Sequence, residues 1–107
     1  MRIVVIGAES AGLGAQLAAH LHLPHLHGVA EVTGDAFVID GAPRDAAEAR
    51  ALDAILRARA AEVDAVLVLG AAPEDVVGHY HGRVVELEAA DAFDSALAGL
   101  REVLLAA

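Results

Sequence analysis

Short apolar runs alternate along the chain with longer stretches of helical periodicity. The runs are rich in β-branched residues and cover residues 3–6, 37–39, 65–69 and 84–87. The first three lack polar alternation, which is typical of parallel strands covered on both faces. We therefore predict four strands at these positions, with residues 84–87 the weakest pattern.

Between the runs lie four segments with helical spacing, at residues 14–23, 45–63, 73–80 and 92–105. The third begins at Pro73, which suits a first helical turn, and continues with acids that favour the positive end of a helix. In the last segment Asp91 is placed to cap the helix. An apolar stripe on that segment predicts a core-facing side, made of Phe93, Leu97, Leu100 and Leu104.

Strands that alternate with helices in this way favour right-handed βαβ units. The fold class we predict is α/β, a three-layer doubly wound parallel sheet of four to five short strands with helices on both faces. Residues 1–107 form one domain in this interpretation. Residues 23–36 are ambiguous, because 29–32 reads either as a short extra strand or as an irregular connection.

Composition limits which kinds of functional site the chain can contain. The chain has no cysteine and no lysine, and its seven basic residues are scattered arginines against 16 acids, for a net charge of −9. Cysteine nucleophiles, thiolate zinc sites and a basic surface for nucleic acid are thereby excluded. No apolar run approaches the ~20 residues of a membrane helix, and the start does not read as a signal peptide. We expect a cytoplasmic protein with no membrane partner.

A glycine-rich turn follows the first strand, where residues 7–16 read Gly-Ala-Glu-Ser-Ala-Gly-Leu-Gly-Ala-Gln. Backbone N–H groups at such a turn converge near a helix N-terminus and attract anions. The spacing of Gly7 and Gly12 matches a phosphate-binding loop, but Leu13 and Gly14 follow where that loop has lysine and Ser or Thr. Two interpretations stay open: a tight strand-to-helix turn, or residual binding of a nucleotide or small anion.

Several motifs together resemble the adenylate kinase (nucleoside monophosphate kinase) family, which has the P-loop NTPase-like fold. The glycine turn is similar to that family's G-x-P-G-x-G-K-G-T-Q loop, and residues 23–26, Leu-Pro-His-Leu, are similar to its I-P-H-I. The most specific likeness is in residues 37–44, Phe-Val-Ile-Asp-Gly-Ala-Pro-Arg, which resemble F-x-x-D-G-F-P-R. The resemblance covers nearly the whole chain, although the chain is roughly half as long as a typical member.

The resemblance also implies which roles are lost. Leu13 stands where the family's loop lysine meets the phosphates, and Ala15 stands where its threonine lies near the metal. Glu9 replaces a loop proline, and its carboxylate would repel a phosphate by ~1–4 kcal/mol. Phosphoryl transfer depends on positioning and charge stabilisation, so these changes predict negligible kinase turnover.

Other positions match the family. Arg44 corresponds to the arginine that contacts the acceptor phosphate, Arg83 to an arginine at the entrance of the lid, and Asp40 to the motif aspartate. The resemblance implies that the monophosphate-binding segment and the lid are excised, since about ten residues separate positions 26 and 37 and a predicted strand follows Arg83 at once. The binding residues predicted are Gly7, Gly12, Leu13, Gly14, Arg44 and Arg83. Solvated or acid-paired arginines, with Asp40 or Asp45 near Arg44, are the alternative interpretation.

Six histidines invite comparison with a metal site, because His20, His22, His25 and His27 fall within eight residues. Residues at i and i+2 of a helix do not share a face, and no cysteine is present. Surface or hydrogen-bonded histidines are the simpler interpretation, so we predict no metal ligands and no cofactor.

These inferences favour a catalytically degenerate adenylate-kinase-like protein, a non-enzymatic binding or assembly module that self-associates or binds a protein partner. Excision of two covering segments is expected to uncover apolar surface around the strand ends. Two alternatives stay open: a sensor that binds nucleotide or phosphate weakly, and a residual nucleoside monophosphate kinase.

Overall fold

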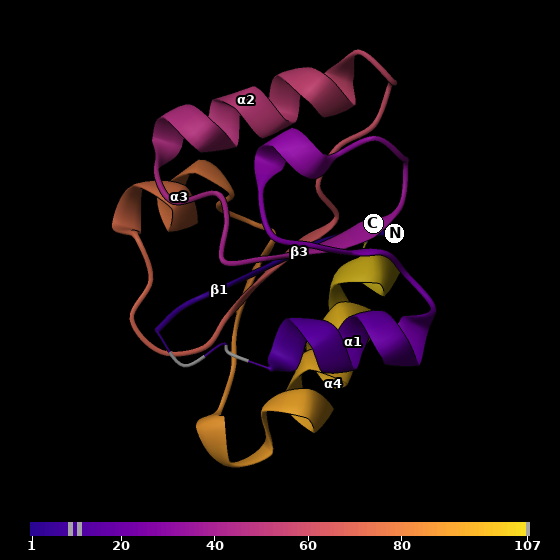
Figure 1. Cartoon of the computed structure of the whole chain (residues 1–107). Coiled ribbons are helices and arrows are strands. Elements are labelled where there is room, and N and C mark those ends of the chain that lie inside the picture. Colours follow the sequence, from indigo (N-terminus) through magenta and orange to yellow (C-terminus); the bar gives the residue numbers. More distant parts are fainter. Residues whose placement is uncertain (9, 11, 107) are drawn as a thin grey trace.

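The chain folds around one parallel sheet of five strands in the order β2-β3-β1-β4-β5 (Figure 1). The computed structural model describes residues 1–8, 10 and 12–106, with the backbone only at 89 and 104–106. The strands are β1 (Arg2–Ile6), β2 (His25–Leu26), β3 (Phe37–Asp40), β4 (Ala65–Val68) and β5 (Val84–Glu86). The helices are α1 (Leu13–Leu21), α2 (Ala46–Arg57), α3 (Glu74–His79) and α4 (Ala92–Ala106), with 3₁₀ turns at Val29–Glu31 and Ala89–Asp91.

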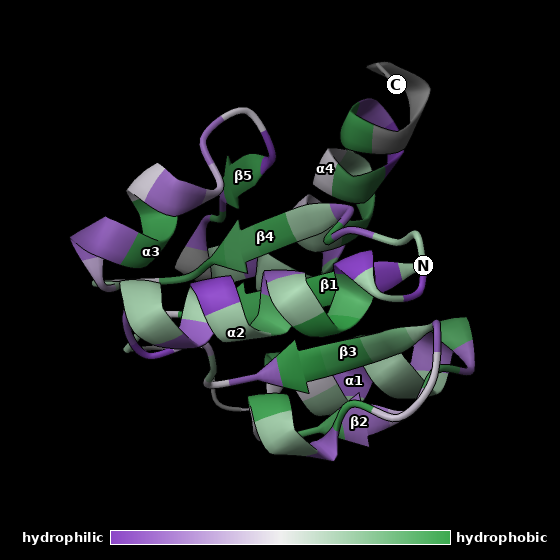
Figure 2. Ribbon diagram, turned by 90° about the horizontal axis from the view of Figure 1, so that it is seen from above, coloured by the Kyte–Doolittle hydropathy of each residue, from purple (hydrophilic) through white to green (hydrophobic). Residues whose placement is uncertain are grey.

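The predicted fold class is confirmed, and so are the four predicted strands. β1 lies at the centre of the sheet and pairs in parallel with β3 and β4, so that Val4 is opposite both Ile39 and Val66. Strands in this position are buried on both faces, and this explains the uninterrupted apolar sequence of β1, β3 and β4. Figure 2 shows the apolar colour along these three strands.

Two helical layers enclose the sheet, with α2 and α3 on one face and α1 and α4 on the other (Figure 1). Successive residues of β1 alternate between two cores: Val4 packs beneath α2, and Val5 beneath α1 and α4. Leu52 and Leu56 of α2 are fully buried, and each such side chain stabilises the fold by about 2 kcal/mol. Of the predicted stripe on α4, Leu100 lies in the core and Phe93 and Leu97 pack against it, while the side chain of Leu104 lies outside the described residues.

The ambiguous segment contains a strand, but not at the residues where one was considered. Residues 29–31 form a 3₁₀ turn, in which the Glu31 N–H donates to the Gly28 carbonyl at 3.1 Å. The fifth strand is instead the two-residue β2, whose His25 lies opposite Val38 of β3. A strand this short has no hydrophobic periodicity of its own, so only its pairing with β3 defines it.

Helix α2 ends at Arg57, and the predicted continuation to residue 63 is wrong. Ala60 adopts a left-handed conformation with φ 55°. The Ala61 N–H donates to the Leu56 carbonyl at 2.9 Å, which closes the end of the helix as in a Schellman motif. The chain must turn there because Val63 is buried and leads directly into β4.

The expected cap of the last helix is also different. Asp91 lies inside the 3₁₀ turn that runs into α4, and its Oδ1 accepts a hydrogen bond from the Ser95 hydroxyl at 3.0 Å. Helix α2 has a side-chain cap, in which Asp45 accepts from the Glu48 N–H at 2.8 Å. Capping of this kind satisfies an N–H group that the helix itself leaves without a partner.

Large hydrophobic side chains are rarely exposed on the described surface of the protein. Within the described residues Met1 is the one large hydrophobic side chain that is exposed, at 39%. Apolar surface around the strand ends, which the sequence led us to expect, would therefore have to come from small or partly buried side chains in this part of the chain. No helix among the described residues is long and apolar enough to span a membrane.

Candidate functional site

The glycine turn lies at the carboxyl edge of the sheet and packs closely on the end of β4. Gly7 has φ 121°, and a Cβ atom there would lie 2.1 Å from the Leu69 carbonyl oxygen. The Ala8 N–H donates to the Ala71 carbonyl at 2.8 Å, and the Ser10 hydroxyl donates to the Gly7 carbonyl at 2.9 Å. Gly7 is required for this approach of two backbones, whatever else the turn binds. The prediction for Glu9 lies outside the described residues.

Leu13 begins α1, and its side chain points into the protein. It is 3% exposed and lies in the core between the sheet, α1 and α4, in the same cluster as Leu17 and Leu100. Its backbone N–H donates to the Ser10 carbonyl at 3.0 Å. The side chain at this position therefore contributes to packing and presents nothing to a ligand at the carboxyl edge.

The first turn of α1 faces a carboxylate. A Cβ atom on Gly14 would lie 2.6 Å from Asp40 Oδ2, so glycine leaves the room that Asp40 occupies. Asp40 Oδ2 is also 3.4 Å from His25 Nε2. The register explains this pair, because His25 lies opposite Val38 and Asp40 is two residues further along the same face of β3. A carboxylate near a helix N-terminus is stabilised by the helix dipole.

Arg44 is exposed at the same edge, just before α2. Its side chain is 79% exposed and pairs with Glu48, the two groups lying 2.9 Å apart. The hydrogen bond to Arg44 lowers the pKa of the Glu48 carboxyl, and the same bond raises the pKa of Arg44. The predicted acid pairing of Arg44 is thus found, but with Glu48 in place of Asp40 or Asp45.

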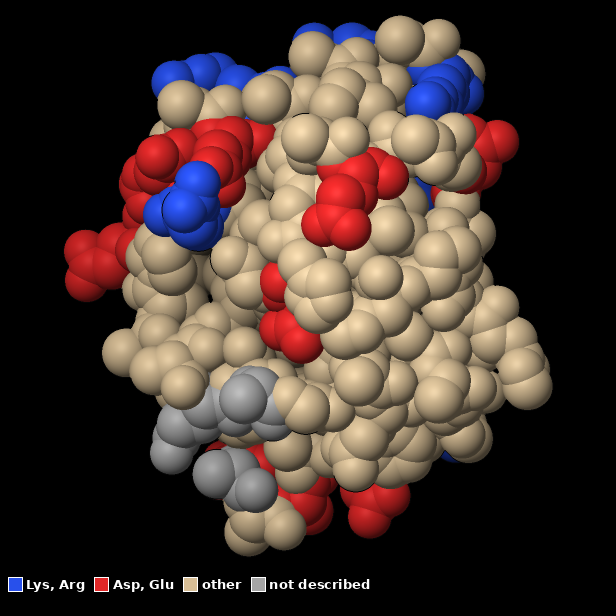
Figure 3. All heavy atoms as spheres, viewed as in Figure 1, with Lys and Arg blue, Asp and Glu red and all other residues tan. Residues whose placement is uncertain are grey.

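A hollow of about 580 Å³ lies beside Arg44. Its wall comes from the turn after β2, the turn after β3 and the start of α2, with His27, Gly28, Val29, Ala30, Gly41, Ala42, Arg44 and Glu48 as lining residues. Figure 3 shows acidic atoms gathered over the N-terminal ends of α2 and α3, where Asp45, Glu74 and Asp75 lie. The carboxyl edge is thus acidic, with Arg44 as a cation that projects from it.

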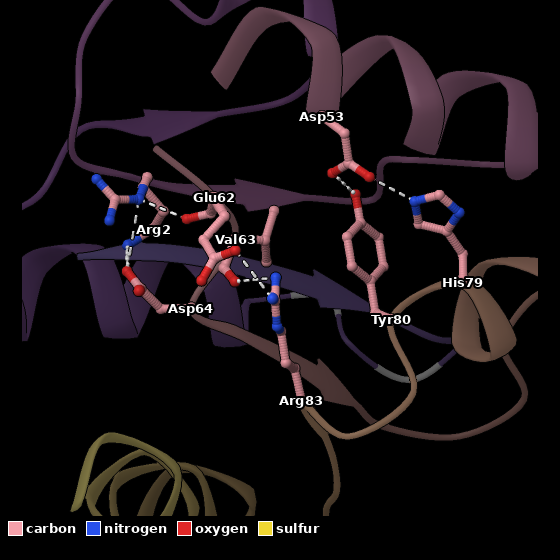
Figure 4. A network of polar contacts seen from close by, with 8 residues as sticks. All are labelled: Arg2, Asp53, Glu62, Val63, Asp64, His79, Tyr80 and Arg83. Atoms are coloured by element: carbon pink, nitrogen blue, oxygen red, sulfur yellow. Dashed lines mark hydrogen bonds and ion pairs between the residues drawn. The ribbon is translucent and has the colours of Figure 1, made fainter. Parts of the chain in front are cut away.

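Arg83 lies at the opposite edge of the sheet. Its guanidinium donates to the Val63 carbonyl at 3.0 Å and to Glu62 Oε2 at 2.9 Å (Figure 4). Arg83 precedes β5 and Val63 precedes β4, and the amino ends of parallel strands meet at one edge. The structure therefore brings Gly7, Gly12, Gly14 and Arg44 to the carboxyl edge and separates Arg83 from them.

A polar network that the sequence did not indicate joins α2 to the end of α3. Asp53 Oδ1 accepts from the Tyr80 hydroxyl at 3.2 Å, and Asp53 Oδ2 is 2.5 Å from His79 Nε2 (Figure 4). Tyr80 is 3% exposed. Burial first, and then the charge of Asp53, raise the pKa of the Tyr80 hydroxyl well above its ordinary value. The only sequence signal was weak: Tyr80 stands between two histidines.

The histidines lie in separate places. His20 contacts the ring of Phe93 edge-on, whereas the rings of His25 and His27 are 4.5 Å apart near the carboxyl edge. Among the described residues no three His, Cys, Asp or Glu side chains are arranged to hold a metal ion.

No protein-family profile matches the chain, but comparison with individual proteins finds relatives. It is 30% identical to an adenylate kinase of Streptomyces lividans over 133 aligned positions, which cover 79% of this chain and 64% of that protein. It is 29% identical to an adenylate kinase of Streptomyces coelicolor over 134 positions, which cover 79% of this chain and 59% of that protein. The chain thus spans about three fifths of the length of the curated relatives it matches. With the parallel sheet and the glycine turn at its carboxyl edge, these matches make the chain a distant relative of the adenylate kinases.

Proposed function

We propose that this adenylate-kinase-like core does not transfer phosphate and acts as a non-catalytic binding module. The observation that carries the proposal is the side chain of Leu13. It occupies the position where the resemblance expects the loop lysine, and it is 3% exposed within the hydrophobic core. Phosphoryl transfer needs preorganised positive charge at the phosphates, and this position supplies none.

The positions of two other residues, Asp40 and Arg83, support the same conclusion. Asp40 places a carboxylate against the first turn of α1, at Gly14. Arg83, which the resemblance assigns to the entrance of a lid, is bonded at the far edge of the sheet.

The alignment with the Streptomyces lividans relative is consistent with missing substrate-closing segments. Since 79% of 107 residues is about 85, roughly 48 of the 133 aligned positions fall opposite gaps in this chain. Closing segments exclude water and complete the catalytic arrangement in enzymes that have them. Without them, bound phosphates stay exposed to water.

A coupled assay for ADP formation from ATP and AMP tests the proposal. We expect no turnover above a protein-free blank, with the Streptomyces coelicolor adenylate kinase as the positive control at equal concentration. ADP formation by the purified chain that Arg44→Ala abolishes and Arg50→Ala leaves intact would overturn it. Arg50 is a suitable control because it is exposed on the same helix, α2.

Arg44 favours a second candidate function, the binding of a nucleotide or phosphate without catalysis. Its exposed guanidinium borders the hollow of about 580 Å³ at the carboxyl edge of the sheet. A guanidinium suits bidentate contact with a phosphate. Calorimetric titration with ATP, ADP and AMP tests this: binding that Arg44→Ala weakens and Arg50→Ala does not would support it. No heat at millimolar nucleotide would exclude it.

The proposed module would bind a protein partner, and that partner could be a second copy of the chain. Because Met1 is the one large hydrophobic residue exposed among those described, such a partner would meet mainly polar and small side chains. Sedimentation equilibrium tests self-association, with a dimer at micromolar concentration as the supporting result. A monomer at every concentration would exclude self-association.

A further inference from the structure

A second hollow, of about 440 Å³, opens on the α2 and α3 face near the amino edge of the sheet. It lies between the C-terminal half of α2, the turn after that helix and the loop that joins α3 to β5. Its wall includes most of the polar network of Figure 4, and its lining residues are Asp53, Arg57, Ala61, Glu62, His79, Tyr80, His81 and Arg83. Neither the glycine turn nor Arg44 contributes to it.

The acidic groups of this hollow are already engaged by the protein. Both oxygens of Asp53 have partners, Tyr80 on one side and His79 on the other. Glu62 accepts from Arg83 at 2.9 Å. Both acids are thus hydrogen-bonded within the protein, and the charge of Glu62 is balanced by Arg83.

The nitrogen-bearing side chains of the hollow are not all engaged in the same way. Arg57 forms no ion pair with any residue that the structure describes, and Asp53 engages only Nε2 of His79 there, which leaves Nδ1 facing no carboxylate. His81 adds a second imidazole to the wall. Two of the seven arginines and two of the six histidines line this one hollow, in a chain with 16 acids.

The carbonyl groups at the end of α2 are already bonded within the protein. Its last carbonyls accept backbone hydrogen bonds, since the Leu56 carbonyl receives the N–H groups of Arg59 and Ala61, and the Arg57 carbonyl receives that of Ala60. These bonds satisfy carbonyl groups that the helix leaves without a partner, but the negative end of the helix dipole stays beside the hollow, so an oxyanion there depends on the charge of Arg57. The side chains therefore set the chemistry of the hollow.

We propose that this hollow is a second binding site, for a small oxyanion carried as a phosphate or carboxylate group. The planar guanidinium of Arg57 is suited to two parallel hydrogen bonds with such a group, and an imidazole N–H of His81 adds a further donor. The size of the hollow is within the range of small-molecule sites. This site is separate from the carboxyl edge, so it does not depend on whether the glycine turn binds phosphate.

The composition of the chain provides a reporter for the experiment. Tyr80 is the single tyrosine and the chain has no tryptophan, so tyrosine fluorescence reports on this hollow alone. Inorganic phosphate is titrated into the full chain at fixed ionic strength, with chloride as the balancing anion, and citrate provides the carboxylate arm. We expect a saturable change in fluorescence with at least one of the two oxyanions at millimolar concentration.

Matched variants locate the site. Arg57→Gln should weaken binding by about tenfold, as expected for the loss of a charge-assisted contact, whereas Arg50→Gln on the same helix should bind as the native chain does. Both side chains are exposed, so neither change should prevent folding. A fluorescence response that chloride reproduces, or that Arg57→Gln leaves unchanged, would overturn the proposal.

Ring signals of the histidines in NMR spectra separate this site from the one at the carboxyl edge. Oxyanion binding here should shift His79 and His81 and leave His25 and His27 in place. If only His25 and His27 shift, the anion binds at the carboxyl edge, and the second site is excluded while the phosphate-binding candidate above is supported. Kinase turnover with no shift of His79 and His81 would reject both proposals.

Discussion

The two edges of the sheet are built in different ways. At the carboxyl edge, the glycine turn approaches β4 through backbone atoms, Gly7 against Leu69, and the exposed Arg44 pairs with a neighbour in sequence. Near the amino edge, Asp53 is joined to His79 and Tyr80, side chains 26 and 27 residues away in the chain. The edge with the recognisable motif is thus defined by backbone geometry, and the edge without one by tertiary side-chain contacts.

This difference separates what a resemblance to a family can locate in this chain from what it cannot. Glycines in a turn persist for steric reasons, because Gly7 has no room for a Cβ atom, whether or not a phosphate is bound. Fold and function are separate inferences. The charged groups have to be located individually, since Arg83, which resembles a family residue in sequence, lies at the edge opposite the glycine turn.

The largest loss of stability is expected from a substitution at Gly7, where two backbone segments approach closely. Gly7→Ala would put a Cβ atom 2.1 Å from the Leu69 carbonyl oxygen at a φ of 121°. Strain and displacement of β4 should destabilise the fold by about 4 kcal/mol. Chemical denaturation gives the free energy of unfolding. The control is Gly34→Ala, where nothing lies within 4 Å of the added atom and stability should hardly change. Equal stabilities would contradict the close approach of the turn.

Leu13→Lys tests whether the glycine turn keeps the geometry of a phosphate-binding loop. The native side chain is 3% exposed in the core, so a buried ammonium and lost packing should destabilise the fold by about 3 kcal/mol. We expect no gain in ATP affinity. Leu13→Met is the control, since it conserves volume and should cost about 1 kcal/mol. A variant that folds well and binds ATP would show that residue 13 can turn towards the ligand.

The folded protein should lose stability at alkaline pH because of Tyr80, which lies near the amino edge of the sheet. Tyr80 has a raised pKa in the folded protein, so its contribution to stability is complete below its unfolded pKa of about 10 and is lost at about 1.4 kcal/mol per pH unit above it. The chain has no lysine or cysteine, so no other side chain should titrate between pH 9 and 12.

Measurement of unfolding at pH 9 and pH 11 checks this, with tyrosinate absorbance as the site-specific signal. Tyr80→Phe should remove the slope. It should also lower stability at neutral pH by about 1 kcal/mol, because a hydrogen bond to Asp53 is lost. A normal tyrosine titration in the folded chain would contradict the buried network.

The smallest effect is expected at Arg44, on the carboxyl edge. Arg44→Ala should lower the stability of the fold only slightly, because both partners of its pair with Glu48 are accessible to solvent. The pKa of Glu48, lowered by Arg44, should rise towards its ordinary value of 4.5. The small stabilisation from this pair is present above that value and is lost as the pH falls. Titration of the Glu48 carboxyl carbon by NMR checks the shift, and a pKa unchanged by the substitution would contradict the pairing.

Much of the fold could be predicted from local pattern. The apolar runs located β1, β3, β4 and β5, because strands with both faces buried need continuous hydrophobic sequence. β2 could not be found in this way, since two residues carry no pattern. The end of α2 was missed because alanine favours a helix, whereas Ala60 takes a left-handed conformation that the approach to β4 requires.

The candidate site was predictable only in part. The glycine turn and Arg44 were located by motif, because their role depends on neighbours in sequence. The pairing of His25 with Asp40 needed the β2–β3 register. The network of Asp53, His79 and Tyr80 needed the packing of α3 against α2, which no local pattern contains.

The sequence by itself determined the parallel α/β architecture, the relationship to adenylate kinases and the absence of a lysine from the glycine turn. The tertiary structure alone decided that Leu13 is buried, that Arg83 lies across the sheet from Gly7 and that a polar hollow forms beside Tyr80. The physical reason is the range of the interactions. Hydrophobic periodicity is local and can be read along the chain, whereas the surroundings of a charged or buried side chain depend on segments that only folding brings together.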